Sequence, residues 1–115
     1  MATPDDFRRI ALAFPGAEEK AHMAHPDFRV GGRIFATLGV PGRDWGMVAL
    51  LPEEQELTIA AEPEAFSPAA GAWGRRGATL VKLEAVSQEW LARTLEWAWR
   101  RRARRTARPR NRPSD

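Results

Sequence analysis

The chain has 115 residues, a formal net charge of +3 and no cysteine, so it is long enough for one domain with a single hydrophobic core. The lack of cysteine excludes disulfides, thiolate metal sites and a cysteine nucleophile. The first residues are acidic and no stretch is apolar over the roughly 18–20 residues that a membrane span requires. We therefore expect no signal peptide, no membrane partner and a cytoplasmic location.

The charge is divided unevenly along the chain. Residues 100–115 hold eight arginines and one acid, a net charge of +7, whereas residues 1–99 hold 10 basic and 14 acidic side chains, a net charge of −4. The basic field is therefore local to the C-terminal segment and is screened over about 8–10 Å in physiological salt. We expect residues 1–104 to form one domain and residues 105–115 to form a basic, disordered tail, because arginine, proline and polar residues dominate that segment.

The N-terminal half predicts one helix followed by strands joined by turns. Thr3 and Pro4 are typical of a helix start, and apolar residues then recur at helical spacing until Phe14-Pro15-Gly16 ends the helix. Residues 18–23 are compatible with a strand that Pro26 interrupts or leaves at a sheet edge. Further strands are predicted at residues 28–30, 33–39 and 45–50.

The C-terminal half completes the predicted fold. It contains a predicted helix at 52–61, a loop or frayed helix end at 63–70, a turn or second hairpin at 72–78, a strand at 79–84 and a helix from 87 to about 103. The order α-β-β-β-α-β-β-α predicts an α+β, two-layer sandwich in which an antiparallel sheet carries its helices on one face. We expect Trp73 and Trp97 to be mostly in the core and Trp99 to be exposed.

The two histidines, His22 and His25, form a His-x-x-His pair. On a helix this spacing places both rings on one face, whereas on a single strand the odd separation sends them to opposite faces. A zinc site needs further ligands, and only Glu18 and Glu19 are near in the sequence. We therefore expect no metal site, and we interpret His25 with the following proline as a turn element.

Catalytic motifs are absent from the sequence. It has no Gly-x-Ser-x-Gly elbow, no Gly-x-Gly-x-x-Gly loop and no Walker-type loop. The adjacent carboxylates Glu18 and Glu19 would point to opposite sides of a strand, which does not suit paired acid–base chemistry. We expect no catalytic residue and no cofactor, and we do not expect an enzyme.

One glycine-flanked segment combines arginine with an indole. Arg75 and Arg76 lie between Gly74 and Gly77, directly after Trp73. Exposed on a turn, these arginines would bind phosphate while the indole stacked on a base. The alternative is that the indole belongs to the core and the arginines are only solvated.

The other glycine turn carries Arg29 and Arg33, one on each side of residues 31–32. A two-residue turn pairs Arg29 with Ile34 and Val30 with Arg33. Cross-strand partners share a face, so the two arginines are predicted on opposite faces unless the hairpin tip twists.

Several motifs occur in order over about residues 5–103. They are Phe14-Pro15-Gly16 with Glu18-Glu19, His25-Pro26-Asp27-Phe28-Arg29-Val30, Gly32-Arg33-Ile34-Phe35-Ala36 and Gly71-Ala72-Trp73-Gly74-Arg75-Arg76-Gly77-Ala78-Thr79, followed by Leu83 and a closing helix. Together they resemble the MmcQ/YjbR family. The resemblance implies an α-β(3)-α-β(2)-α fold like that of secretion chaperones, a "double wing" of hairpins, and DNA binding.

We therefore expect a non-enzymatic, DNA-binding protein. The residues expected to contact nucleic acid are Arg29, Arg33, Arg75, Arg76, Lys82, Arg101, Arg104 and Arg105. The alternative is a protein-interaction module that uses the sheet face or a tryptophan-lined groove, as the likeness to secretion chaperones implies. A third hypothesis is a small-ligand binder or enzyme with a pocket formed by Glu18, His25 and Trp73.

Overall fold

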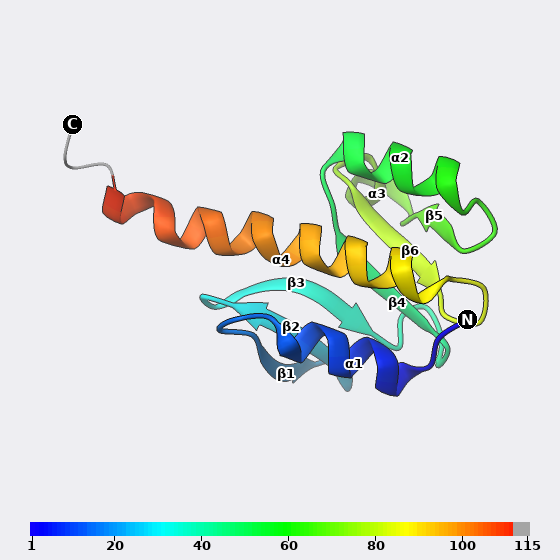
Figure 1. The fold of residues 1–115 in the computed structure, drawn as a ribbon, viewed down its shortest axis with the longest axis horizontal. Coiled ribbons are helices and arrows are strands. Elements are labelled where there is room, and N and C mark those ends of the chain that lie inside the picture. Colours follow the sequence, from blue (N-terminus) through cyan, green and yellow to red (C-terminus); the bar gives the residue numbers. More distant parts are fainter. Residues whose placement is uncertain (112–115) are drawn as a thin grey trace.

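A computed structural model of the chain describes the backbone of residues 1–111 and the side chains of residues 1–104. Figure 1 shows how the elements are arranged. In chain order they are α1 (Pro4–Ala13), β1 (Glu18–His22), β2 (His25–Val30), β3 (Arg33–Leu38), β4 (Trp45–Ala49), α2 (Pro52–Ala61), β5 (Phe66–Pro68), α3 (Gly71–Arg75), β6 (Ala78–Lys82) and α4 (Gln88–Asn111).

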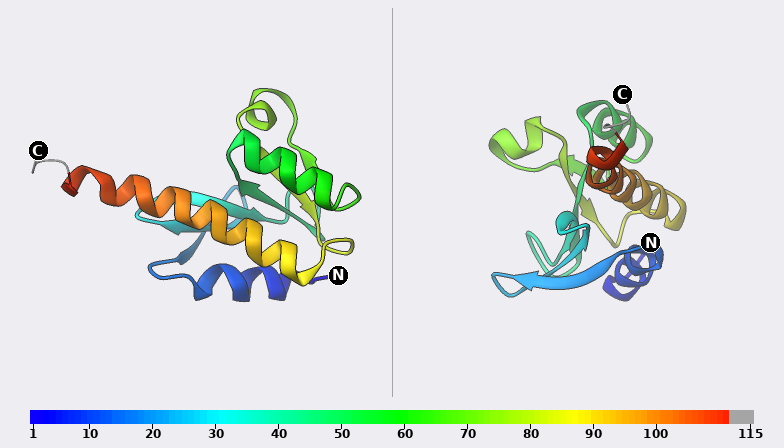
Figure 2. Two further views of the ribbon diagram at one scale, coloured as in Figure 1. Left: turned by 45° about the horizontal axis from the view of Figure 1, so that its top comes forward. Right: turned by 90° about the vertical axis from the view of Figure 1, so that its left-hand side faces the viewer.

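The strands form one antiparallel sheet with the order β1-β2-β3-β4-β6-β5. In the right-hand view of Figure 2, α1, α2 and α4 lie on one side of the sheet and the short helix α3 lies on the other. The predicted α+β sandwich is confirmed, with α3 as an addition to the second face. The sheet thus has a face covered by long helices and a face that is largely open.

The core fills the space between the sheet and the helices α1 and α4. Ala36 and Val48 are cross-strand partners, so they share the covered face, and both are buried. The ring of Phe7 from α1 packs 5.8 Å from that of Phe28 on β2. A Cβ atom on Gly46 would lie only 2.6 Å from the Phe7 ring, so this glycine allows α1 to approach the sheet closely. Each large apolar side chain buried here contributes about 1.5–3 kcal/mol.

The sequence is compatible with a strand at residues 18–23, and the structure has one there, β1. β1 pairs with β2, and His22 lies opposite His25 at the end of the ladder. Met23 and Ala24 form the turn between them with φ values of 51° and 68°, which is the left-handed backbone of a primed two-residue hairpin turn. The sheet therefore has four strands before α2, one more than the three of the expected fold.

The region after α2 differs from the prediction. The loop or frayed helix end predicted at 63–70 contains the short strand β5, and the turn or second hairpin predicted at 72–78 contains α3. β5 and β6 are antiparallel neighbours, but they are joined through a helix and not by a tight turn. Arg75 and Arg76 therefore stand at the end of a helix and not on a hairpin tip.

Two glycines explain why this segment folds as it does. A Cβ atom on Gly74 would lie 1.8 Å from the carbonyl oxygen of Ala69, and one on Gly77 would lie 1.9 Å from that of Leu50. The buried amide of Gln55 on α2 reaches over and donates to the carbonyl oxygen of Gly74 at 3.0 Å. These glycines are therefore required for close backbone packing, which the sequence pattern alone interprets as a turn.

Helix α4 extends to Asn111, beyond the end predicted near Ala103. The division into a domain at 1–104 and a disordered tail at 105–115 stays a prediction, and residues 112–115 lie outside the described part of the chain. No helix among the described residues is both long and apolar enough to span a membrane.

The tryptophans divide differently from the prediction. Trp73 is 66% exposed and is not a core residue. Trp99 is half-buried, since its ring stacks on Phe14 and its Nε1 donates to the carbonyl oxygen of Pro15 at 2.9 Å. Trp97 is also half-buried and packs against the core. Of the two tryptophans expected in the core, Trp73 is exposed and Trp97 is half-buried.

Replacement of Gly77 by alanine should destabilise the fold far more than the same change at Gly32. Both glycines have positive φ, but Gly32 has open space around it, whereas Gly77 lies against the backbone of Leu50. We expect Gly32→Ala to cost roughly 1 kcal/mol and Gly77→Ala about 3–5 kcal/mol. Urea unfolding measures both, and equal losses would show that the contact with Leu50 is unimportant.

Candidate functional site

The open face of the sheet contains a cavity of about 540 Å³. Its floor includes Ile34, Met47 and Ala49. Met47 pairs with Thr37 and Ala49 pairs with Ala78, so these side chains occupy the face opposite to buried Val48. The floor is therefore a largely apolar sheet surface, and of the long helices α4 also contributes to the lining of the cavity.

Five arginines line this cavity, and we call the cavity with its arginines the basic pocket. They come from three parts of the fold: the β2–β3 hairpin, α3 and the C-terminal half of α4. They are Arg29, Arg33, Arg76, Arg101 and Arg102. The tertiary structure thus gathers cations that are up to 73 positions apart in the sequence.

Two of these arginines connect α4 to the sheet. Arg101 Nη1 donates to the carbonyl oxygen of Leu50 at 3.2 Å, and Arg102 Nε donates to that of Ile34 at 3.1 Å. Both side chains are partly buried. The contacts hold the C-terminal half of α4 at the pocket, and the helix continues past the cavity to Asn111.

Two other arginines of the pocket are exposed and available to a ligand. Arg33 follows the β2–β3 turn and Arg76 follows α3. Among the side chains that the structure describes, none forms an ion pair with either of them. An anion bound between them would meet two guanidinium groups that it need not first release from a carboxylate.

Asp27 is fully buried beside the pocket and is bound by Arg29 and His22. Arg29 donates two hydrogen bonds to the Asp27 carboxylate, from Nε to Oδ1 at 2.8 Å and from Nη2 to Oδ2 at 3.1 Å. His22 Nδ1 lies 2.6 Å from Oδ2. The hydrogen bonds from Arg29 are the main reason that the pKa of Asp27 is lowered, and they outweigh the opposing effect of burial. We call these three residues the Asp27 network.

The Asp27 network determines the orientation of Arg29 and His22 in the pocket. A bidentate carboxylate holds the planar guanidinium in one position. His22 is also oriented, because one of its ring nitrogens is bound to Asp27. The network thus lines one wall of the pocket with preorganised polar groups.

The register of the first hairpin is confirmed, with Arg29 opposite Ile34 and Val30 opposite Arg33. A bulge between Phe28 and Arg29 interrupts the pairing. Arg29 and Arg33 nevertheless line the same pocket. The pairing supports the prediction that the two arginines leave the hairpin on opposite faces, and the pocket at the hairpin tip is lined by both.

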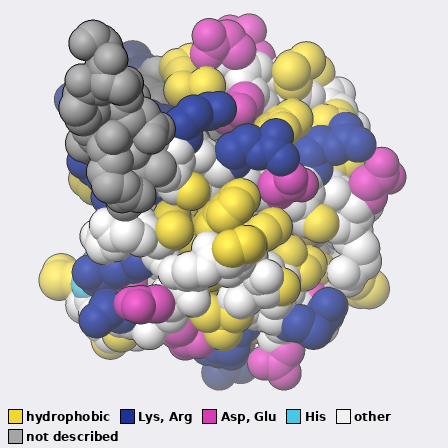
Figure 3. Space-filling view, turned by 60° about the vertical axis from the view of Figure 1, so that its left-hand side comes forward, with side chains coloured by type: hydrophobic (Ala, Val, Ile, Leu, Met, Phe, Trp, Pro, Cys, Tyr) yellow, Lys and Arg dark blue, Asp and Glu magenta, His cyan; other side chains and the backbone are white. Residues whose placement is uncertain are grey.

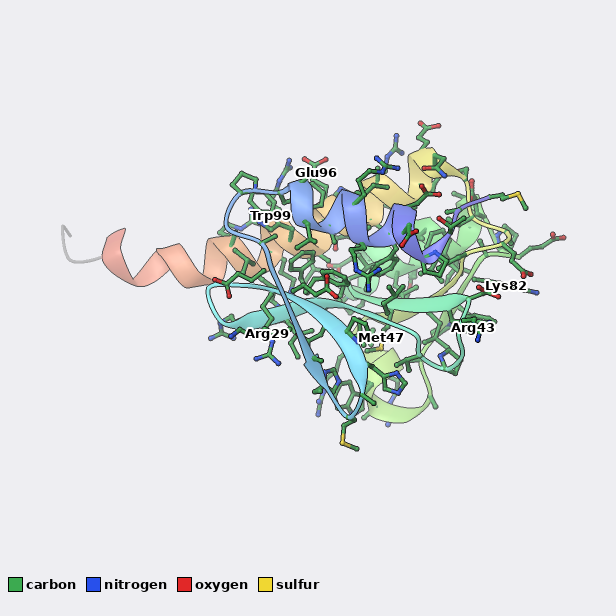
Figure 4. All side chains as sticks on the ribbon, turned by 90° about the horizontal axis from the view of Figure 1, so that it is seen from below. Arg29, Arg43, Met47, Lys82, Glu96 and Trp99 are labelled. Carbon is green, nitrogen blue, oxygen red and sulfur yellow. The ribbon has the colours of Figure 1, made fainter. Side chains whose placement is uncertain are left out.

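Other predicted nucleic-acid residues lie outside the pocket. Arg75 is exposed at the end of α3, and Arg104 is exposed on α4. Figure 4 places Lys82 beside Arg43 at the end of the sheet away from Arg29. The side chain of Arg105 lies outside the described residues.

The alternative pocket of Glu18, His25 and Trp73 is not assembled. Trp73 lines the basic pocket, but the other two do not. Glu18 is exposed on the edge strand β1, and His25 lies near Gly39 at the other end of the hairpin. The three residues therefore do not form one site.

The His-x-x-His pair lies neither on a helix nor on a single strand. His22 and His25 belong to two strands and lie opposite each other, so they share a face. His22 is bound to Asp27. Within the described residues, no group of three metal-ligating side chains is found.

Several residues of the pocket were missed by the sequence analysis. They are His22 as a polar wall, the floor residue Met47 and Arg102, together with the buried Asp27 beside the pocket. One signal for Asp27 was available, because Asp27 and Arg29 are two positions apart on a predicted strand and so share a face. Arg101 was predicted from its place in the arginine-rich stretch, but its proximity to Arg29 and Arg33 had no signal in the sequence.

Basic side chains do not form a broad continuous surface on the side of the molecule shown in Figure 3. There, the lysines and arginines that are coloured alternate with acidic and hydrophobic side chains. This interspersed pattern contrasts with the pocket, where five arginines line one cavity. The pocket is therefore a local concentration of arginines.

Comparisons with known proteins agree on one family and one fold. The family model YjbR matches residues 12–101. The crystal structure of the Deinococcus radiodurans protein DR2400, assigned to the domain DUF419, superimposes with a TM-score of 0.71 and 23% sequence identity, covering 85% of this chain and 76% of that one. No curated protein matches the sequence. At that identity the likeness to DR2400 shows the fold alone.

Substitution of Asp27 by asparagine should destabilise the protein in a pH-dependent manner. Loss of charge-assisted hydrogen bonds at a buried carboxylate costs about 2–3 kcal/mol. The pKa of Asp27 lies below its ordinary value of 3.8. The charged carboxylate therefore stabilises the fold fully above pH 3.8, and this stabilisation is lost progressively as the pH falls below 3.8. Thermal unfolding should therefore show a large difference between Asp27→Asn and wild type at pH 7 that narrows below about pH 4.

The matched control for this prediction is Asp5→Asn. Asp5 also faces an arginine, but its side chain is 95% exposed, so its loss should leave the melting temperature unchanged. A difference between Asp27→Asn and wild type that stays constant from pH 7 to pH 3 would contradict the proposed role of the carboxylate charge.

Proposed function

The chain belongs to the YjbR family, and we propose that it is a non-enzymatic nucleic-acid-binding protein whose basic pocket contacts the phosphate backbone. The observation that carries the proposal is the convergence of five arginines from three separate parts of the fold on one cavity. Arginine suits this role because its planar guanidinium binds phosphate oxygens with two parallel donors. DNA is the nucleic acid that the sequence resemblance favours.

The distribution of charge supports a local contact. Residues 1–99 carry a net charge of −4, so attraction by the whole domain cannot drive the binding of a polyanion. Arg33 and Arg76 are exposed at the pocket, and α4 continues from Arg101 and Arg102 into a stretch of sequence with five more arginines. Arginines of the pocket and of this stretch of sequence would each contribute phosphate contacts.

A protein partner is the second candidate, and the floor of the pocket favours it. Apolar side chains and an exposed indole within a ring of arginines also suit an acidic segment of a second protein. We rank this candidate below nucleic acid because the resemblance of the sequence to the MmcQ/YjbR family implies DNA binding.

Charge reversal at the pocket should abolish most of the binding. We expect Arg33→Glu/Arg76→Glu to weaken the affinity for a fluorescein-labelled 20-nucleotide DNA by more than about 10-fold in 50 mM salt, because two phosphate contacts are lost. The slope of log K against log salt should also become shallower by about 1.5–2. Fluorescence anisotropy of the full chain measures both quantities.

Arg43→Glu/Lys82→Glu is the control, since it makes the same change in net charge at the other end of the sheet. We expect it to change the affinity less than about threefold. If both double variants lose affinity equally, the pocket is not the contact site. If the wild-type chain shows no binding up to about 100 μM, a concentration at which even non-specific binding is normally detected, the proposed function is wrong.

A further inference from the structure

The one large exposed aromatic side chain at the basic pocket is Trp73. It is 66% exposed, although it lies on a short helix that close backbone packing holds in place. It lines the pocket together with Arg76, three positions later in the chain. An exposed indole beside a guanidinium group presents a flat face on which a planar ligand can stack.

The floor of the pocket imposes a second condition on the ligand. Ile34, Met47 and Ala49 offer no hydrogen bonds from their side chains, so a ligand that fills the cavity must bring an apolar or aromatic surface. Duplex DNA presents phosphates and sugars to a concave surface and keeps the faces of its bases inside the stack. A single strand, in contrast, can turn an unpaired base into the cavity.

The shape of the site also opposes duplex recognition. Proteins that read duplex bases place a protruding element, such as a helix, a β-ribbon or an extended arm, into a groove of the DNA. The described residues of the pocket form a hollow of about 540 Å³, which receives a ligand and cannot enter a groove. A volume of this size accommodates a nucleotide, as is usual for small-molecule pockets.

We infer that the basic pocket selects single-stranded nucleic acid, with one unpaired base inserted over the apolar floor and stacked on Trp73 while Arg33 and Arg76 hold the flanking phosphates. The inference rests on the proposed function and narrows its ligand class. The arginines supply affinity that depends on salt and not on strandedness, whereas the indole and the floor supply the preference for an unpaired base.

Three oligonucleotides of 20 positions test this inference: a thymidine single strand, the duplex that contains the same strand, and an abasic single strand with the same phosphates but no bases. In fluorescence anisotropy at 100 mM salt, we expect the thymidine strand to bind wild type at least about 10-fold more tightly than the other two. Stacking of one base is worth about 5- to 100-fold in affinity. Equal affinity for the thymidine and abasic strands would overturn the inference.

Variants at Trp73 isolate the contribution of the indole. Trp73→Leu keeps an apolar side chain without an aromatic face, and Trp73→Phe keeps a smaller aromatic ring. Since Trp73 is exposed, both variants should retain the wild-type melting temperature. We expect Trp73→Leu to lose about 5- to 50-fold in affinity for the thymidine strand and less than twofold for the abasic strand, and Trp73→Phe to recover most of the loss. Equal losses on both strands would show that Trp73 does not stack on a base.

The outcomes separate failure of this inference from failure of the proposed function. If no oligonucleotide binds, both are wrong. If the duplex and the thymidine strand bind equally and both depend on Arg33 and Arg76, the proposed function holds and the single-strand preference is wrong. If a polyglutamate of equal charge displaces the thymidine strand as well as unlabelled thymidine strand does, the pocket recognises charge alone, as an acidic protein partner would require.

Discussion

The close backbone contacts of Gly74 and Gly77 determine the architecture of the open face. Neither position has room for a Cβ atom, since each lies against a carbonyl oxygen of a neighbouring segment. The Gln55 amide reinforces the contact by donating to the carbonyl oxygen of Gly74. These interactions hold α3 beside β6, and they place Trp73 and Arg76 at the pocket. The carbonyl group of Leu50, which packs against Gly77, also accepts a hydrogen bond from Arg101, so α3 and α4 meet the sheet at the same point.

One face of the sheet forms the core and the other forms the floor of the pocket. Successive side chains along each strand point to opposite faces, so neighbouring residues serve different roles. On β4, Val48 is buried under the helices while Met47 and Ala49 form the floor of the basic pocket. The covered face supplies the apolar burial that stabilises the domain. The open face is therefore free to carry arginines and an exposed indole without loss of core packing, which is the usual division between scaffold and site.

The net charge of the chain is a poor guide to its electrostatics. The total of +3 combines an acidic domain with an arginine-rich end, and folding then brings Arg101 and Arg102 of that end against the sheet. Within the pocket the effect of one arginine is offset, because Arg29 is bound to Asp27. The local field at the cavity therefore comes from the other four arginines, of which Arg33 and Arg76 are exposed and form no ion pair among the described side chains.

The sequence by itself determined the fold class, the first helix, the register of the hairpin at Gly31-Gly32 and the family, because these depend on local signals: capping residues, apolar periodicity, turn glycines and ordered motifs. It also identified Arg29, Arg33, Arg76 and Trp73 as functional candidates. It did not distinguish a hairpin turn from α3, since a glycine needed for close backbone contact and a glycine needed for a turn look alike in a sequence. Only the tertiary structure decided which candidates share a site. Lys82 and His25 lie outside the pocket, whereas His22 and Arg102 line it and the buried Asp27 orients two of its residues. The tertiary structure also places Trp73 in solvent and not in the core. The physical reason is that a pocket is formed by residues far apart in the chain, whose proximity depends on how the helices pack on the sheet and not on any local pattern.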